Sequence, residues 1–322
     1  MSFKETVNSV LYRATGLRLT SETPEERRDA IKRAERTAAR RARERTADRH
    51  RRKALEREAR HQKQLAQQKE RLEERRLVQR KLNEARRESG DNLPTHLDDV
   101  TRRIIAKVSP RTMTGAAGLE SLVEATRYVV HHRIPGEIVE CGVWRGGGMQ
   151  AVALALLSLG DSSRELHLFD TFEGMPPPTA EDTRRQQNGE TVAAAAMLAE
   201  AAKTEAVWSV AGLDDVREGM ADTGYPADKV RYHVGMVEET TPGEAPEQIA
   251  ILRLDTDWYA STKHELETLY ERLSPGGVLM IDDYADWDGA RKATDEWLEI
   301  SGEVLFLIPM GTGRIAVKPV AG

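Results

Sequence analysis

Apolar residues follow two different patterns along this chain of 322 residues. From about Thr95 onward, short apolar runs alternate with stretches of helical periodicity, as buried parallel strands alternate with the helices that connect them. The runs predict strands at Glu137–Cys141, Glu165–Asp170, Val230–Gly235, Ile249–Asp257, Gly277–Asp283, Glu303–Pro309 and Arg314–Lys318. The helices predicted between them are Gly148–Leu159, Thr262–Leu273 and Asp288–Ile300.

The last two predicted strands are separated only by Met310-Gly-Thr-Gly, so they form a hairpin and run antiparallel. Residues 95–322 are therefore predicted to form an α/β domain, with a doubly wound, mainly parallel sheet and an antiparallel last strand. This pattern resembles the Rossmann-like fold of the class I methyltransferases.

The preceding segment has the opposite pattern, with very few large apolar residues. Thr23-Pro24-Glu25-Glu26 has the N-cap, proline and acids of a helix start, and neither Gly nor Pro occurs from Glu25 to Glu88. The sequence thus predicts a long charged helix over residues 23–90. Leu65 and Leu72 are one heptad apart, but no heptad pattern persists over four repeats. A solvated single helix and a coiled coil both fit this segment.

Charge divides the chain at the same place. The segment Glu25–Ser89 has 24 Lys or Arg and 13 Asp or Glu, a net charge of +11. The whole chain carries −5, so the remainder carries −16. A net positive segment attracts phosphate, but the acids interspersed in it argue against nucleic acid as a partner.

Composition also bears on the compartment. The single cysteine, Cys141, excludes an intramolecular disulfide and favours a reducing cytoplasm. No apolar run approaches the ~20 residues of a membrane-spanning helix. Residues 1–22 contain a short amphipathic helix that fits either a capping role or a membrane-surface anchor.

A glycine-rich turn follows the first predicted strand, in the sequence Ile138-Val-Glu-Cys-Gly-Val-Trp-Arg-Gly-Gly-Gly148. Ligands of doubly wound sheets bind at the carboxyl ends of such strands. Gly142 would let the backbone approach a ligand closely, and Glu140 suits a cationic or amine-bearing ligand better than a pyrophosphate. The turn lacks the G-x-G-x-x-G spacing of dinucleotide sites. A glycine turn that serves only packing is the alternative.

Asp170 ends the next predicted strand, within Leu166-His-Leu-Phe-Asp-Thr-Phe-Glu-Gly. A carboxylate at this position can accept both hydroxyls of a ribose. NAD and S-adenosylmethionine both contain that ribose, so Asp170 does not distinguish between them. An aspartate that only caps a helix is the alternative.

Acidic residues gather after two further strands. Asp255 and Asp257 end one strand, and Asp282 and Asp283 end another. If these strands are neighbours, four carboxylates meet at one edge of the sheet, and Arg253 alone cannot balance them. Oxygen ligands favour a hard cation such as Mg²⁺, with Mn²⁺ or Ca²⁺ as alternatives. The alternative is that these aspartates only cap the helices that follow the strands.

Several of these segments together carry a family resemblance. The residues that carry it are IVECGVWRGG, LFDTFEGMP, LRLDTDWYAST, LSPGGVLMIDDY and GARKA. From Thr112 to Pro319 the chain resembles the macrocin O-methyltransferase family, whose members methylate deoxysugar hydroxyls of macrolides and related antibiotics. The charged segment Glu25–Ser89 departs from the pattern of the family.

The resemblance implies roles for individual residues. It places Glu140, Gly142 and Asp170 in the S-adenosylmethionine site, with Thr112, Met113 and Thr114 near the amino-acid end of that cofactor. It implies that Asp255, Asp282 and Asp283 ligate Mg²⁺. Asp257 stands where the family has its general base.

The implied function is an enzyme of antibiotic biosynthesis that methylates a sugar hydroxyl. The acceptor would be a glycosylated natural product or a nucleotide sugar, and we expect a cytoplasmic homo-oligomer. A catechol or phenol O-methyltransferase is the enzymatic alternative, and a non-catalytic scaffold on a helical rod is the alternative of another class.

Two features near these motifs concern the acceptor. Trp258 and Tyr259 follow Asp257 and could either stack on a sugar face or pack in the core. The segment Glu173–Gly189 is rich in Pro, Thr and Gln and is long for a loop, so we expect it to cover the site.

Overall fold

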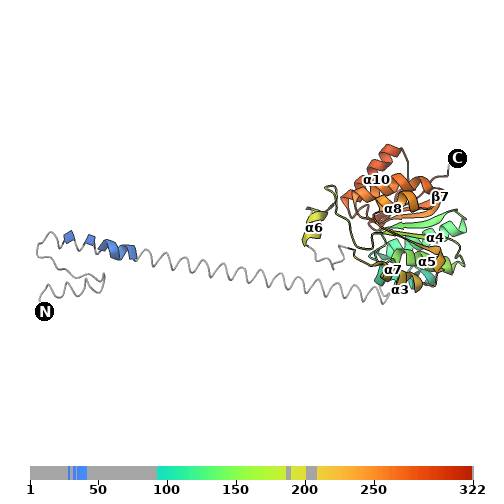
Figure 1. Cartoon of the computed structure of the whole chain (residues 1–322), viewed down its shortest axis with the longest axis horizontal. Coiled ribbons are helices and arrows are strands. Elements are labelled where there is room, and N and C mark those ends of the chain that lie inside the picture. The colour runs from blue at the N-terminus through green and yellow to red at the C-terminus, as the bar shows by residue number, and fades with distance from the viewer. Residues whose placement is uncertain are drawn as a thin grey trace. The chain divides into compact units, whose positions relative to one another are not determined.

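We analysed a computed structural model of the chain, which describes residues 28–29, 32–33, 35–41, 93–185, 190–200 and 209–320. The chain separates into two compact units, Met1–Lys81 and Leu82–Gly322. Both sheets belong to the second unit (Figure 1).

The first unit is helical wherever it is described, at residues 28–29, 32–33 and 35–41. Bonds of helical spacing occur there: Arg33 Nε donates to the Asp29 carbonyl at 3.3 Å, and Thr37 Oγ1 donates to the Arg33 carbonyl at 2.9 Å. The rest of the predicted helix, its weak heptad pattern and the amphipathic segment 1–22 lie outside the described residues.

A seven-stranded sheet forms the centre of the second unit. Its strands are β1 (Glu137–Cys141), β2 (Leu166–Asp170), β5 (Val230–Val234), β6 (Ile249–Leu254), β7 (Leu273–Ile281), β8 (Ile308–Met310) and β9 (Gly313–Val317). They lie in the order β5-β2-β1-β6-β7-β9-β8. Neighbours from β5 to β7 are parallel, whereas β9 is antiparallel to both β7 and β8. The predicted doubly wound sheet with an antiparallel last strand is confirmed.

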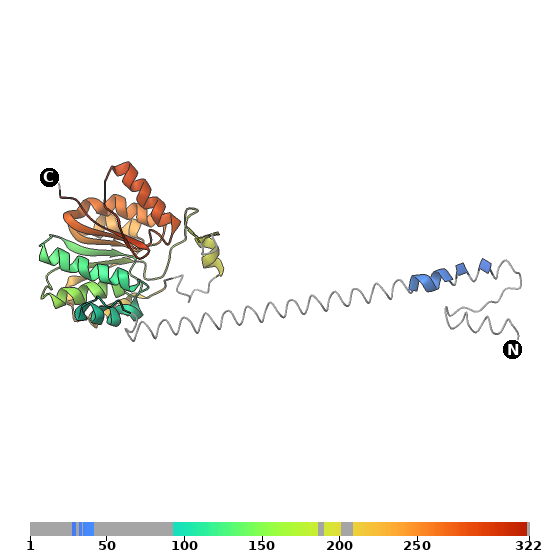
Figure 2. The ribbon, with the colours of Figure 1, turned by 180° about the vertical axis from the view of Figure 1, so that it is seen from behind.

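Helices cover both faces of this sheet (Figure 2). One face carries α3 (Asp99–Val108), α4 (Ala116–His131), α5 (Gly147–Ser158) and α7 (Leu213–Ala221), and the other carries α8 (Val237–Glu244), α9 (Tyr259–Leu269) and α10 (Asp288–Ser301). Successive residues of β1 point to opposite faces, so Ile138 packs in one apolar core and Val139 in the other. A strand covered on both sides is apolar throughout, which is why the central strands appear as continuous apolar runs.

Some strands are shorter in the structure than the sequence pattern predicts. The strand expected at Ile249–Asp257 ends at Leu254, and Asp257 has a φ of 66° that no extended strand allows. The strand expected at Glu303–Pro309 is reduced to Ile308–Met310. It is the outer strand of the sheet, and its only described neighbour, β9, ends at Val317, so the first three residues of the predicted run, 303–305, lie beyond the end of that neighbour.

The segment after β2 contains elements that the sequence pattern did not predict. The strands β3 (Thr183–Arg185) and β4 (Thr191–Ala193) form a separate antiparallel pair, followed by α6 (Ala194–Glu200). Both strands have only three residues, too few for any periodicity to show. The described short 3-10 helices are η1 (Ser109–Arg111), η3 (Ala227–Lys229) and η4 (Tyr270–Arg272), the last of which replaces the end of the predicted helix Thr262–Leu273.

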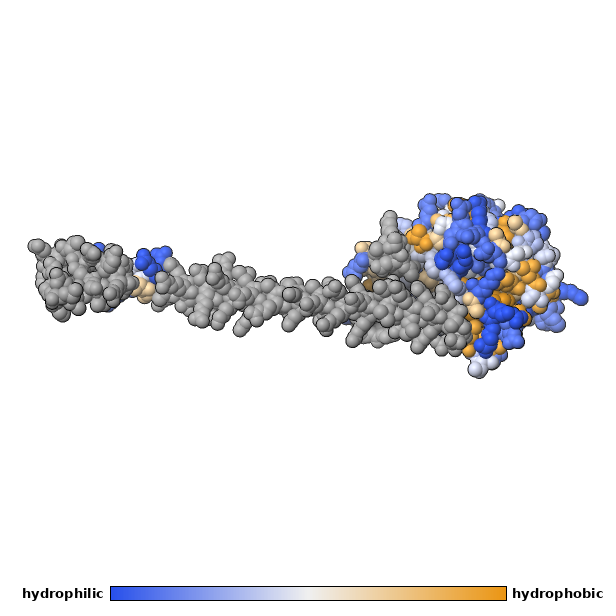
Figure 3. Space-filling model, turned by 90° about the horizontal axis from the view of Figure 1, so that it is seen from below, coloured by the Kyte–Doolittle hydropathy of each residue, from blue (hydrophilic) through white to orange (hydrophobic). Residues whose placement is uncertain are grey.

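The surface of the second unit mixes hydrophilic and hydrophobic residues on the face shown in Figure 3. None of the helices in the described ranges combines the length and the apolar character that crossing a membrane requires. Cys141, the only cysteine, is fully buried at the end of β1. Burial raises the pKa of its thiol, and the nearby Glu265 and Glu140 carboxylates raise it further.

We predict that deleting residues 1–90 leaves a folded domain. All described strands lie beyond this point, and Leu93 and Leu97, which pack with α3, are retained. The truncated protein should unfold in one cooperative thermal transition, with a midpoint within a few degrees of the full-length value. An insoluble product, or one without a cooperative transition, would show that the N-terminal residues are integral to the domain.

Candidate active site

One cavity of about 670 Å³ lies at the carboxyl ends of the parallel strands. The nine side chains or backbone positions predicted from the sequence to form the site all border it: Thr112, Met113, Glu140, Gly142, Asp170, Asp255, Asp257, Asp282 and Asp283. The prediction that these residues come together therefore agrees with the structure, because each follows the end of a strand or precedes α4.

Gly142 begins the turn between β1 and α5, with a φ of 78°. A Cβ atom on this residue would overlap the carbonyl oxygen of Asp255, so any side chain would separate the ends of β1 and β6. Asp255 N–H also donates to the Cys141 carbonyl at 2.8 Å. The glycine turn therefore holds the backbone of the acidic segment directly against it.

Glu140 is buried beneath this turn, with 2% of its surface exposed. One carboxylate oxygen, Oε1, accepts from Arg253, and the backbone N–H of Met149 also donates to the carboxylate. The other oxygen, Oε2, has no hydrogen-bond partner among the described residues. Burial raises the pKa of Glu140, and Arg253 opposes this rise. A buried carboxylate oxygen without a donor fits an amine-bearing ligand.

Asp170 holds the glycine-rich turn through backbone donors. Its Oδ2 accepts the N–H groups of Val143 at 2.7 Å and Trp144 at 3.1 Å, and its Oδ1 accepts from Phe172 at 2.8 Å. Burial raises the pKa of Asp170, and these three donors lower it. Asp170 therefore fixes two turns and caps no helix in the described part of the chain, and each carboxylate oxygen keeps a further lone pair for a ligand.

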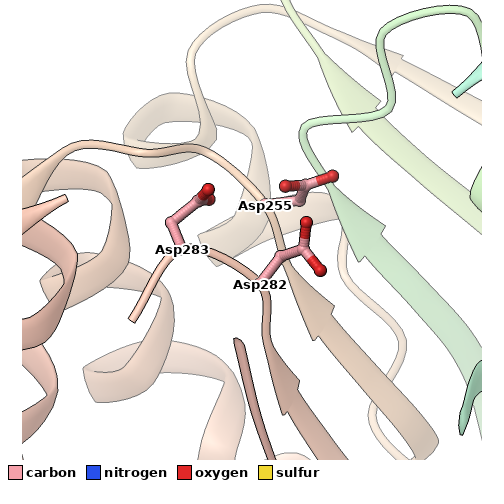
Figure 4. A group of neighbouring side chains, drawn as sticks. All are labelled: Asp255, Asp282 and Asp283. Carbon is pink, nitrogen blue, oxygen red and sulfur yellow. The ribbon is translucent and has the colours of Figure 1, made fainter. Parts of the chain in front are cut away.

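Asp255, Asp282 and Asp283 form a cluster just beyond β6 and β7, where their carboxylates turn toward a common space (Figure 4). One oxygen from each of the three lies within 4.8 Å of the other two. Burial raises the pKa values of Asp255 and Asp283, and repulsion from the other acids of the cluster raises them further. Three oxygen donors that destabilise one another in this way fit a hard divalent cation.

Asp257 lies beside this cluster but is turned away from a strand conformation. Its carboxyl hydrogen-bonds with that of Asp283 and with the side chain of Trp287, and its N–H donates to Asp283 Oδ2 at 3.3 Å. Burial raises the pKa of Asp257 to about 7, against the lowering effect of the Asp283 hydrogen bond. The strand predicted at Ile249–Asp257 includes Asp257, which the left-handed backbone of this residue contradicts.

Arg253 is the main residue of the site to which the sequence analysis gave no role. Its guanidinium forms ion pairs with Glu140, with Asp255 at 2.7 Å and with Asp282 at 3.2 Å. It also donates to Thr114 Oγ1 at 2.7 Å, and only 3% of its surface is exposed. The register of the two strands would have identified it, because Arg253 of β6 stands directly opposite Glu140 of β1.

The aromatic residues after Asp257 pack instead of facing the cavity. Trp258 is 2% exposed, donates from Nε1 to the Pro176 carbonyl at 2.9 Å and packs edge-on against Trp287. Tyr259 donates to Glu296 at 2.6 Å. The packing alternative is therefore correct, and it is Trp287 that borders the cavity.

The segment after β2 forms part of the cavity wall, through Gly174, Met175, Pro176 and Arg184. Asp182 anchors it, since this buried carboxylate accepts from Thr179 N–H at 2.6 Å and from Tyr259 N–H at 2.7 Å. Arg184 forms an ion pair with Asp286 at 2.7 Å, with its guanidinium 5.4 Å from the centre of the Trp287 ring. The described part of the expected cover, residues 173–185, is thus fixed to the N-terminal ends of α9 and α10, whereas residues 186–189 lie outside the described ranges.

The sheet order, the glycine turn and the acidic strand ends define an S-adenosylmethionine-dependent O-methyltransferase, and comparison with known proteins agrees. The family model described as macrocin-O-methyltransferase (TylF) matches residues 29–303. The chain belongs to this family. The match begins inside the charged segment, so the expectation that Glu25–Ser89 departs from the family pattern was wrong for most of that segment.

Characterised relatives act in natural-product pathways. The chain is 34% identical over 220 residues to the 8-demethyl-8-(2,3-dimethoxy-α-L-rhamnosyl)-tetracenomycin-C 4′-O-methyltransferase of Streptomyces olivaceus, covering 65% of this chain and 80% of the relative. It is 31% identical to the mycinamicin III 3″-O-methyltransferase of Micromonospora griseorubida, covering 71% and 82%. The solved structure of the O-methyltransferase NovP matches with a TM-score of 0.57 and 26% identity, covering 74% of this chain and 88% of that chain.

Proposed function

We propose that this enzyme transfers a methyl group from S-adenosylmethionine to a sugar hydroxyl of a glycosylated natural product, assisted by Mg²⁺. The proposal rests on one observation, which is that two groups of residues border the same cavity. Glu140 and Asp170 suit the cofactor, while Asp255, Asp282 and Asp283 suit a divalent cation next to a candidate base, Asp257. The relatives named above support a sugar acceptor.

The cofactor-binding part would hold S-adenosylmethionine at both ends. The unpartnered Oε2 of Glu140 would accept from the ammonium of the methionine moiety, and Thr112 and Met113 border the same end of the cavity. Asp170 would accept from the ribose hydroxyls with its remaining lone pairs. Gly142 leaves room for the cofactor to lie close to the backbone.

Mg²⁺ would be held by Asp255, Asp282 and Asp283. When bound, it would lower the energy of the alkoxide that develops on a sugar hydroxyl, which is too weakly acidic to ionise unaided at neutral pH. Asp257 would accept the proton of that hydroxyl, because its carboxylate borders the cavity beside the three ligands. The walls of the cavity would align the hydroxyl with the methyl group.

The charges of the cavity favour a glycoside over a nucleotide sugar as acceptor. Its described lining includes eight acids, whereas its only basic side chains are Arg184 and Arg253. Both arginines are already paired with carboxylates, so neither is available for a diphosphate. Met175, Met197 and Trp287 supply an apolar wall suited to an aglycone.

A catechol or phenol acceptor remains the enzymatic alternative, since such enzymes use the same cofactor and metal. A lysine near the reacting oxygen would favour it, and none lines the described cavity, where Asp257 is present instead. A non-catalytic scaffold is disfavoured because the complete set of predicted site residues borders the cavity. The cytoplasmic location and the homo-oligomer stay predictions.

We predict that Asp282→Asn abolishes Mg²⁺-dependent turnover and leaves the affinity for S-adenosylhomocysteine nearly unchanged, because Asp282 faces the metal cluster. Turnover with and without EDTA and calorimetric titration of the cofactor product would measure both effects. Asp286→Asn is the matched control, since Asp286 borders the same cavity but pairs with Arg184. Full wild-type turnover in EDTA would contradict the metal requirement.

We predict that Asp257→Asn lowers kcat by about 10²–10⁴-fold, the usual loss when a general base is removed. Mg²⁺ and cofactor binding should persist, because the amide keeps the shape of the side chain. Steady-state turnover assays would measure the effect on kcat. Calorimetric titrations of the same sample would measure the effect on Mg²⁺ and cofactor binding. A variant that keeps its rate and loses Mg²⁺ would make Asp257 a ligand instead of the base.

We predict that kcat/KM for deoxysugar glycosides with apolar aglycones exceeds that for nucleotide diphosphate sugars carrying the same sugar. The reason is that a diphosphate would enter an acidic cavity without finding an unpaired cation among the described residues. A panel of matched pairs, assayed at fixed Mg²⁺, makes the comparison. Preference for the nucleotide sugar in each pair would reverse our assignment of the acceptor class.

A further inference from the structure

Arg253 occupies a central position in the site, because one guanidinium contacts acidic side chains that follow three neighbouring strands. Glu140 belongs to β1, Asp255 follows β6, and Asp282 follows β7. The ion pairs to Asp255 and Asp282 measure 2.7 Å and 3.2 Å, and the shortest contact is that to Glu140. Since the arginine is 97% removed from solvent, water does not screen these contacts.

The contacts of Arg253 divide between the two parts of the site. On the cofactor side, Nη1 donates to Glu140 Oε1 and Nη2 donates to Thr114 Oγ1 at 2.7 Å. Thr114 in turn donates its N–H to Thr112 Oγ1 at 3.1 Å, which fixes the segment before α4. On the metal side, the guanidinium holds Oδ2 of both Asp255 and Asp282.

This arrangement leaves free the oxygen atoms that a ligand needs. The ion pairs of Arg253 engage Oδ2 of Asp255 and of Asp282, so the second oxygen of each is not used by the arginine, and Glu140 keeps Oε2, which is buried and unpartnered. A planar guanidinium with two donor nitrogens at fixed spacing can hold carboxylates in this way, whereas a lysine ammonium offers a single point of charge.

Electrostatics require such a cation whether or not a metal is bound. Five carboxylates border this part of the cavity: Glu140, Asp255, Asp257, Asp282 and Asp283. Arg253 forms ion pairs with three of them, Glu140, Asp255 and Asp282. Before the cofactor is bound, a divalent cation at the three aspartates would leave Glu140 buried without a counter-charge, and Arg253 supplies it.

We propose that Arg253 is a positioning residue that assembles the cofactor pocket and the metal pocket as one unit. It orients Glu140 and the Thr112–Thr114 segment toward the amino-acid end of the cofactor, and it turns the free oxygens of Asp255 and Asp282 toward Mg²⁺. The inference rests on the proposed function for the identity of both ligands. It adds a residue through which a single substitution affects both sites.

The test compares two separate affinities in full-length variants. Mg²⁺ is titrated calorimetrically into protein saturated with S-adenosylhomocysteine, and S-adenosylhomocysteine is titrated in EDTA. We expect Arg253→Gln to weaken both by about tenfold or more, the usual effect of removing a group that orients metal ligands. Arg253→Lys keeps the positive charge but not the planar guanidinium with its spaced donor nitrogens. It should therefore weaken both affinities less than Arg253→Gln does. Circular dichroism and thermal melts establish that each variant is folded.

Two matched controls separate Arg253 from its neighbours. Asp283→Asn should weaken only Mg²⁺ binding, because Asp283 lies in the aspartate cluster and hydrogen-bonds with Asp257. Arg164→Gln removes a largely buried arginine outside the cavity, which donates to the Ile134 carbonyl at 2.8 Å, and should leave both affinities unchanged. Loss of cofactor affinity in Asp283→Asn, or of either affinity in Arg164→Gln, to the extent seen in Arg253→Gln would reflect general damage and would overturn the proposal.

The remaining outcomes are distinct. Wild-type affinities in a folded Arg253→Gln would overturn the proposal, and so would a loss restricted to one ligand. If Arg253→Gln does not fold, Arg253→Lys decides, since wild-type affinities for both ligands in that variant would exclude a need for the guanidinium fork. A wild type that binds S-adenosylhomocysteine but not Mg²⁺ would contradict the metal in the proposed function itself, and the inference with it.

Discussion

Mutual repulsion of buried carboxylates is the constraint on which the rest of this site depends. Glu140, Asp255, Asp257, Asp282 and Asp283 border one cavity, and burial and mutual repulsion raise the pKa values of four of them. Taking such groups out of water is unfavourable unless counter-charges are present. The arginine at the end of β6 supplies one permanent positive charge, and the remaining excess of negative charge fits the cation that we propose for the cluster.

Topology brings these acids together from three segments that lie far apart in the sequence, around Glu140, Asp255 and Asp282. The crossover connections place β1 between β2 and β6, and β6 between β1 and β7, so the carboxyl ends of four strands open into one cavity. Gly142 then permits the close backbone contact between the turn after β1 and Asp255. The anchored segment after β2 closes one side through Asp182 and the Arg184–Asp286 pair.

Much of this arrangement could be predicted from the sequence, because buried strands are continuous apolar runs and their ends are marked by acids and glycines. Glu140, Asp170 and Asp255 were located in this way. The role of Arg253 depends on its register with Glu140, 113 residues away, which no local pattern contains. The β3–β4 pair is likewise set by tertiary contacts such as that between Asp182 and Tyr259 N–H. The left-handed backbone of Asp257 is equally invisible in a pattern that reads simply as the end of a strand.

The reactivity of Cys141 toward thiol reagents can be used to follow local opening of the domain near the centre of the sheet. It lies between Glu140 and Gly142, has no exposed surface, and burial keeps its thiol protonated. A thiol reagent attacks the thiolate, so it modifies Cys141 only in molecules where the apolar core around it, between the sheet and α8–α10, has opened. Because the protein has no second cysteine, the rate of this modification, relative to that of an exposed thiol, reports on this opening alone, and a ligand held by Glu140 would slow it.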